Sequence, residues 1–180
     1  MLRCTIFLGA ALAAFALPAA ADVSKNPKSA PKGAYEMDPS HTTLTFCVMH
    51  LGLANYCGRF NKTQGTLSFN GSQPEKSKIS VTIDTASVDT ASDALDGKLR
   101  DDLFKVAANP TATFKSPETV TLKTTFNGGL MHPLANAYAI GFSAQGTFKR
   151  SDFGLTDVAW SSFVGDEVTL YIDSEFAAKN

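Results

Sequence analysis

Residues 43–60 decide the fold, and they read TLTFCVMHLGLANYCGRF. Leu44, Phe46 and Val48 alternate with polar or small residues, which is the period-two pattern of a strand with one buried face. A second run of residues follows directly after Gly52, where glycine tolerates a tight turn. The sequence therefore predicts an antiparallel hairpin that turns at Gly52.

This hairpin also carries two cysteines. If the chain turns at Gly52, Cys47 and Cys57 stand opposite each other on the face away from Phe46. A cross-strand disulfide is then geometrically possible, and closing its loop of 11 residues adds about 3 kcal/mol in the chain-entropy model. Two free thiols are the alternative, and the sequence leaves both open.

The same alternation recurs along the chain. It marks half-buried antiparallel strands over residues 66–69, 78–84, 120–126, 138–148 and 168–172. Residues 92–104 break the pattern, because their leucines lie four residues apart and form one stripe on a helix. The predicted fold class is therefore mainly β with one short helix over residues 92–104. A sandwich and a barrel both fit this pattern.

The N-terminal part divides into two segments before a single domain at residues 35–180. Residues 1–21 combine Arg3, an apolar run and small residues before Asp22, which predicts a secretory signal peptide. Residues 22–34 are rich in Lys, Pro, Ser and Ala and predict a flexible leader. After processing, no apolar run reaches membrane-spanning length. We expect a periplasmic or secreted protein.

Charge and motifs argue against several functional classes. Loss of Arg3 would lower the formal net charge from −1 to −2, so no basic excess is available for nucleic acid. The histidines lack the spacing of metal ligands, and no nucleophile elbow or phosphate-binding loop is present. We therefore predict no enzyme, no metal site and no required cofactor. His50 shares parity with Phe46 and Val48, so it is a candidate for one polar contact in the interior.

The interior allows two interpretations. Large apolar residues dominate the inward positions, but Gly58, Gly65, Ala144 and Gly146 share their parity. Small inward residues leave room, and a barrel of about eight strands either fills itself or holds one small ligand. A packed core and an elongated apolar cavity both remain open at this stage.

Several motifs resemble the YceI-like family. Asp38-Pro39-Ser40-His41, followed by Leu44-x-Phe46-x-Val48-x-His50-Leu51-Gly52, looks like the opening of that family. Further matches are Pro110-Thr111-x-Thr113-Phe114-Lys115-Ser116, Lys149-Arg150-Ser151-Asp152-Phe153-Gly154 and Val164-Gly165-Asp166-Glu167-Val168. The resemblance implies an extended, lipocalin-like antiparallel β-barrel in an exported bacterial protein. It also implies that the apolar interior binds a polyisoprenoid chain, as in isoprenoid quinones or polyprenyl lipids.

The chain departs from the family pattern in two places. Lys98 stands where the helix motif usually carries a histidine, so a head-group contact by that histidine is not carried over. After Glu118 the chain is shorter than the family pattern by at least one strand. A barrel that is narrower, gapped or rearranged near residues 117–120 is compatible with this departure, and a gap would expose unpaired edges.

These observations predict a lipid-binding protein that holds a polyisoprenoid chain. The expected apolar lining consists of Phe46, Val48, Phe60, Leu67, Phe69, Val81, Ile83, Leu99, Leu103, Phe104, Phe114, Leu122, Ile140, Phe142, Phe148 and Leu170. The three residues of this set from the helix are expected to cover one end. The alternative is a ligand-free stress-response or interaction module with a filled core. An isoprenoid lipid is the expected partner, and a homodimer is the other assembly considered.

Overall fold

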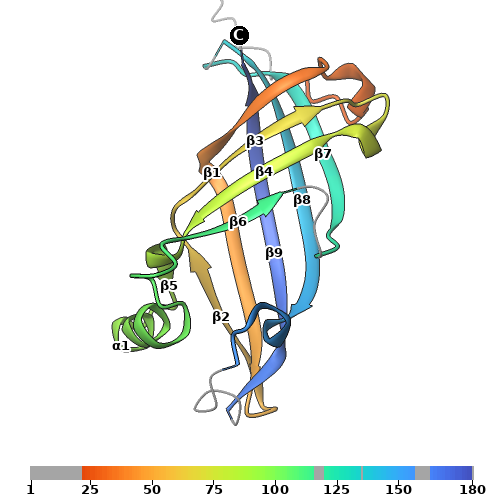
Figure 1. The fold of residues 1–180 in the computed structure, drawn as a ribbon. Coiled ribbons are helices and arrows are strands. Elements are labelled where there is room, and N and C mark those ends of the chain that lie inside the picture. Colours follow the sequence, from red (N-terminus) through yellow and green to blue (C-terminus); the bar gives the residue numbers. More distant parts are fainter. Residues whose placement is uncertain (1–21, 116–119, 135, 157–162, 180) are drawn as a thin grey trace, which may run out of the picture.

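The computed structural model describes residues 22–115, 120–134, 136–156 and 163–179, so the predicted signal peptide lies outside the described residues. The prediction of a mainly β fold with one short helix is confirmed (Figure 1). The strands are β1 (Gly33–His50), β2 (Ala54–Phe60), β3 (Thr63–Phe69), β4 (Lys78–Asp84), β5 (Val88–Asp89), β6 (Thr111–Lys115), β7 (Lys123–Met131), β8 (Tyr138–Lys149) and β9 (Val164–Ala178). The helix is α1 (Asp93–Lys98), which continues into a π-helical turn, η4 (Leu99–Leu103). Short 3₁₀ turns are η1 (Pro27–Ser29), η2 (Pro74–Lys76), η3 (Thr85–Ser87) and η5 (Arg150–Phe153).

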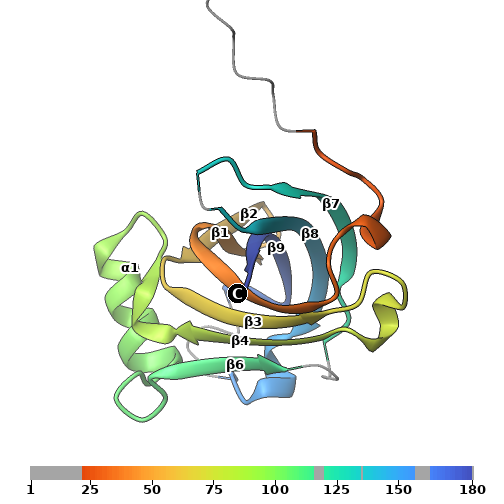
Figure 2. The ribbon, with the colours of Figure 1, turned by 90° about the horizontal axis from the view of Figure 1, so that it is seen from above.

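All strand pairs are antiparallel, and the sheet curls into a barrel (Figure 2). Its strand order is β6-β4-β3-β1-β9-β8-β7, and β2 pairs with β1 and β5 away from this path. Within the described residues, β6 pairs with β4 alone and β7 with β8 alone, so these strands are the two ends of the sheet. The departure from the family pattern near residues 117–120 falls between them, and residues 116–119 lie outside the described part of the chain.

Strand β1 changes partner along its length. Its first residues pair with β3, whereas Leu44 to His50 pair with β2. Strand β9 pairs with β1 on the other side over almost the whole of both strands. As a result, the wall made of β3, β4 and β6 covers one half of the barrel, and the β1–β2 hairpin projects beyond it (Figure 1).

The register of this hairpin agrees with the sequence. Cys47 is the direct cross-strand partner of Cys57, and the structure joins the two sulfurs in a disulfide. At the turn, the Leu53 amide donates to the His50 carbonyl at 2.9 Å, and Leu51 and Gly52 both have positive φ angles of 52° and 68°. Two positive φ angles are the requirement of a type I′ turn.

Aromatic rings close the end of the barrel near the described termini. Phe69 packs against Tyr35, Phe126 and Phe142 with ring centroids 6.1, 6.0 and 5.8 Å apart. Phe142 also contacts Phe176 at 6.1 Å. The Phe69–Phe126 pair is stacked and the other three pairs are edge-to-face, and both kinds of contact at these distances add to the energy of burial. The cluster therefore forms the main core, and burial raises the pKa of the Tyr35 hydroxyl.

The segment that we expected to be a flexible leader instead packs against this end. Ser24 and Gly129 exchange two backbone hydrogen bonds of 2.9 Å, and Ala30 is buried in the core. At Gly71, an added Cβ would lie only 1.9 Å from the Pro27 carbonyl oxygen, so only glycine permits this approach. The sequence does not predict this packing, because the contacting residues of the segment show no hydrophobic periodicity.

Candidate ligand-binding cavity

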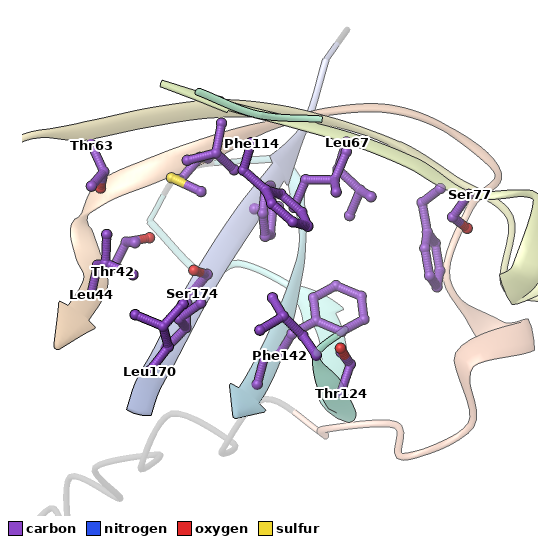
Figure 3. Close-up of a pocket in the computed structure, with 18 of the residues that line it drawn as sticks. Thr42, Leu44, Thr63, Leu67, Ser77, Phe114, Thr124, Phe142, Leu170 and Ser174 are labelled. Carbon is purple, nitrogen blue, oxygen red and sulfur yellow. The ribbon is translucent and has the colours of Figure 1, made fainter. Parts of the chain in front are cut away.

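The barrel contains a cavity of about 580 Å³ between the β3-β4-β6 wall and the opposite wall of β1, β9, β8 and β7 (Figure 3). This volume lies in the usual range of small-molecule sites. Its lining consists of Pro27, Met37, Thr42, Leu44, Thr63, Leu67, Phe69, Pro74, Ser77, Ile79, Val81, Ile83, Phe114, Val120, Leu122, Thr124, Phe126, Phe142, Ala144, Leu170, Ile172, Ser174 and Phe176. The interior is therefore not filled by the side chains of the described residues.

Strand alternation places these side chains. On β4, Ile79, Val81 and Ile83 line the cavity, while the residues between them point to the other face. On β9, the same period brings Leu170 and Ile172 to the opposite wall. The apolar lining thus follows directly from the period-two pattern of the sequence.

The glycines of the inward parity do not provide the open space that we expected. A Cβ on Gly146 would lie 2.5 Å from the Thr121 carbonyl oxygen and 2.8 Å from a Leu122 methyl group. A Cβ on Gly58 would lie 2.6 Å from the ring of Phe46. These glycines are already covered by neighbouring groups. Of the small residues in the prediction, Ala144 is the one that lines the cavity.

The polar groups of the lining are hydroxyls. They belong to Thr42, Thr63, Ser77, Thr124 and Ser174, and no charged side chain is among the described lining residues. Thr42 donates its hydroxyl to the Asp38 carbonyl at 2.7 Å, and the Ser77 hydroxyl accepts from the Asn70 amide at 3.0 Å. Burying a charged group without a partner is costly, so the cavity suits an apolar chain with at most a neutral head group.

Part of the predicted lining lies in this cavity. These residues are Leu67, Phe69, Val81, Ile83, Phe114, Leu122, Phe142 and Leu170. They come from both walls, and Figure 3 shows Phe114 and Leu67 on one side with Phe142 and Leu170 on the other. Their contact with a ligand stays a prediction.

The other predicted residues lie outside the cavity. Ile140 belongs to the buried aromatic core. The rest lie toward the β1–β2 hairpin or the helix, and they are Phe46, Val48, Phe60, Leu99, Leu103, Phe104 and Phe148. The physical reason is the change of partner in β1, because the β3-β4-β6 wall ends where β1 begins to pair with β2.

The helix does not cover the cavity as we expected. Phe104, which follows η4, packs against Phe60 at 5.7 Å, and Phe60 packs against Phe46 at 5.5 Å. Inside this segment, the buried Asp96 carboxylate accepts hydrogen bonds from the amide and hydroxyl of Thr90 at 2.8 and 2.6 Å. These contacts hold the helix on the flank of β2 and β5 (Figure 1).

His50 is also outside the cavity. It is exposed at the end of β1, where it pairs with Ala54 and Val164. The structure therefore places it at the hairpin and not beside the predicted chain. The His50 side chain could contact a ligand inside the cavity only if it lay elsewhere in the structure.

The sequence prediction missed several lining residues that it could have found. Leu44 shares the parity of Phe46, and Ile79 shares the parity of Val81. Ile172 likewise continues the run of Leu170. Pro27 gave no such signal, because it comes from the segment without a hydrophobic period.

The motif Asp38-Pro39-Ser40-His41 lies within β1, with Asp38 half-buried, and is not part of the cavity lining. The Asp38 carboxylate accepts from the Ser40 hydroxyl at 2.5 Å and bonds the His41 Nδ1 at 2.9 Å. These two hydrogen bonds lower the pKa of Asp38 to about 2, and the bond to Asp38 raises the pKa of His41. The register between β1 and β9 shifts between Asp38 and Thr43. The motif therefore lies at an irregularity in the pairing of the longest strand, which its side-chain hydrogen bonds stabilise.

Two other features were sought among the described residues, a metal-ion site and a membrane-spanning helix. No three His, Cys, Asp or Glu side chains in them are grouped so as to hold a metal ion. Their helices also lack the combination of length and apolar composition that crossing a membrane requires.

Fold and cavity together define an antiparallel β-barrel with an apolar interior. The chain belongs to the YceI-like domain family, whose pattern it matches over residues 35–176. A UPF0312 protein of Pseudomonas aeruginosa is 34% identical over 145 residues, which cover 67% of this chain and 75% of the relative. A second UPF0312 protein, from Pectobacterium atrosepticum, is 32% identical over 143 residues, with 68% and 74% covered.

Solved structures show the same fold. A Campylobacter jejuni YCEI protein has a TM-score of 0.62 at 27% identity, over 73% of this chain and 90% of the other. A polyisoprenoid binding domain from Saccharophagus degradans, implicated in plant cell wall breakdown, has a TM-score of 0.57 at 18% identity, over 81% and 98%. At that identity, the second comparison concerns the fold alone.

Proposed function

We propose that this protein binds an isoprenoid lipid, an isoprenoid quinone or a polyprenyl lipid, with its chain in the barrel cavity and without catalysing a reaction. The observation that carries the proposal is a cavity of about 580 Å³ with an apolar lining and only hydroxyls as polar groups. Membership of the YceI-like family supports it. The shared fold of the polyisoprenoid binding domain from Saccharophagus degradans supports it further.

The cavity volume sets the length of chain that is buried. At protein packing density an isoprene unit occupies about 115 Å³, so a cavity of about 580 Å³ accommodates about five units. Burial contributes about 0.8 kcal/mol for each methylene-sized group, which makes the chain itself the main source of affinity. A longer chain would extend beyond the cavity.

The lining also bears on the head group. Thr63, Thr124 and Ser174 supply neutral hydroxyls to the cavity, and the described lining has no cation to balance a phosphate. A quinone or an alcohol fits inside, whereas a phosphorylated head group fits only outside.

Residues 1–21 are the proposed export signal, and we propose a periplasmic or secreted location in which such lipids are handled outside the cytoplasm.

Extraction of the native protein tests the proposal. The full chain is expressed with export in a quinone-producing bacterium, purified without detergent and extracted with organic solvent for mass spectrometry. Leu170→Asp places a carboxylate in the cavity, and Tyr171→Asp places the same group on the exposed outer face of the same strand. We expect prenyl lipid from the wild type and from Tyr171→Asp, and its loss from Leu170→Asp. A wild-type extract without prenyl lipid would overturn the proposal.

A further inference from the structure

Large apolar side chains are exposed at the tip of the β1–β2 hairpin. Leu51 and Leu53 are 53% and 83% exposed, and Met49 just before them is 41% exposed. The amide of Leu51 donates to the carbonyl of Phe163 at 2.8 Å, and the side chain of Phe163 is 54% exposed. These four residues, Met49, Leu51, Leu53 and Phe163, form what we call the hairpin tip. It projects from the end of the barrel opposite the C-terminus (Figure 1).

The backbone of the hairpin tip holds a leucine in a conformation that leucine disfavours. Leu51 has a φ angle of 52°, in the left-handed region where Asn and Gly are usual in this type of turn. The Cys47–Cys57 disulfide lies only a few residues from this turn and ties the two strands together. The tip is thus a stiff, convex projection with outward-facing leucines, at some cost in backbone energy.

An apolar row on the inner face of β1 and β9 leads from just below the hairpin tip to the cavity. Successive cross-strand pairs on the inner face of β1 and β9 are Val48–Val168, Phe46–Leu170 and Leu44–Ile172. Leu44, Leu170 and Ile172 already line the cavity. Phe46 and Val48 remain partly exposed, because the β3-β4-β6 wall does not reach them. The exposed His50, which pairs with Val164, lies between Val48 and the tip, and beyond it an apolar chain can follow this row to the cavity.

The opposite end of the barrel differs. It also exposes a leucine, Leu134, at 91% in the loop between β7 and β8. Behind that loop, however, Tyr35, Ile140 and Phe176 are almost completely buried in the aromatic core. The exposed leucine at that end therefore lies over a buried aromatic core and not beside a partly exposed apolar row.

We propose that the hairpin tip inserts into the surface of a lipid bilayer and that the lipid moves between bilayer and cavity along the inner row of β1 and β9. The second half of this statement rests on the proposed function, whereas insertion of the tip does not. A fluid bilayer suits a convex apolar projection, which needs no complementary groove. Asp166 and Glu167 follow close to the tip in β9, so contact relies on apolar insertion and not on attraction to anionic lipid.

Vesicle flotation tests the insertion. The full-length protein is mixed with phosphatidylcholine vesicles, with and without added phosphatidylglycerol. We expect the wild type to float with both. The variant Leu51→Asn/Leu53→Ser should bind at least about tenfold more weakly, because two interfacial leucines are lost. Asn suits the positive φ at position 51, so this variant should melt no lower than the wild type. Leu134→Ser is the matched control at the opposite end of the barrel and should float like the wild type.

The other outcomes separate failure of tip insertion from failure of the proposed function. Three results would overturn insertion by the hairpin tip. They are a wild type that does not float with vesicles, a double variant that floats like the wild type, and a loss of flotation that occurs only in Leu134→Ser. A dimer in sedimentation that the double substitution abolishes would assign the tip to self-association instead. If vesicle binding persists but no prenyl lipid is taken up, the insertion stands and the proposed function fails.

Discussion

Filling the cavity with a ring gives the sharpest test of how the protein binds its ligand. Ala144 lines the cavity on β8, where its neighbours across the strands are Thr124 and Ile172. In Ala144→Phe, a phenyl ring takes up about 100 Å³ at protein packing density, out of a cavity of about 580 Å³. The ring therefore displaces about one isoprene unit.

The expected loss of ligand affinity follows from the apolar surface that the ligand no longer buries. One isoprene unit has five carbons, and at about 0.8 kcal/mol for each buried group its full exclusion costs about 4 kcal/mol. Contacts between the new ring and the remaining chain recover part of this, so we expect a loss of about 2–4 kcal/mol. Because about 1.4 kcal/mol is a factor of ten, the affinity should fall by a factor of about 30 or more.

Competition against a fluorescent prenyl probe measures this affinity. Gln145→Phe is the matched control, since it adds a ring at the exposed neighbouring position on the outer face of the same strand. We expect Gln145→Phe to bind like the wild type. The apo form of Ala144→Phe should unfold at the wild-type temperature or above, because its ring fills existing space. An unchanged affinity in Ala144→Phe with an intact fold would refute the cavity as the binding site.

Two further predictions concern stability. Reduction of the Cys47–Cys57 disulfide should lower the free energy of unfolding by about 3 kcal/mol, measured by denaturant titration with and without reductant, and equal midpoints would contradict this. The lowered pKa of Asp38, about 2, stabilises the fold above the unfolded value of about 4, and this contribution is lost as the pH falls toward 2. The raised pKa of His41 stabilises the fold below about pH 6.5, and this contribution is lost as the pH rises through the raised value. The melting temperature of Asp38→Asn should therefore fall below that of the wild type most clearly between about pH 4 and 6.5, and a pH-independent difference would contradict this.

Local patterns were sufficient to predict the strands, the hairpin and the helix. The alternation of Leu44, Phe46 and Val48 predicts a strand with one apolar face, and that strand is present. The midpoint at Gly52 predicts the pairing of Cys47 with Cys57, which the register shows. Such features depend on neighbouring residues alone, so a single sequence contains them.

The extent of the cavity could not be predicted in the same way. Phe46 and Leu44 have the same parity, yet only Leu44 lines the cavity, because β1 exchanges β3 for β2 between its two halves. A change of partner depends on the lengths of distant strands and leaves no mark in the local period. Packing of Pro27 and Ala30 against the barrel likewise depends on contacts far away in the sequence.

Intermolecular NOEs show whether an isoprenoid chain lies between the two walls of the barrel. The protein is labelled with ¹³C at the methyl groups of Ile and Leu and loaded with unlabelled geranylgeraniol. We predict NOEs from the prenyl chain to Leu67, Ile83 and Leu170, from three different strands, and none to the exposed Leu134. A bound chain that contacts Leu134 but none of these three lining residues would contradict the placement of the chain between the two walls.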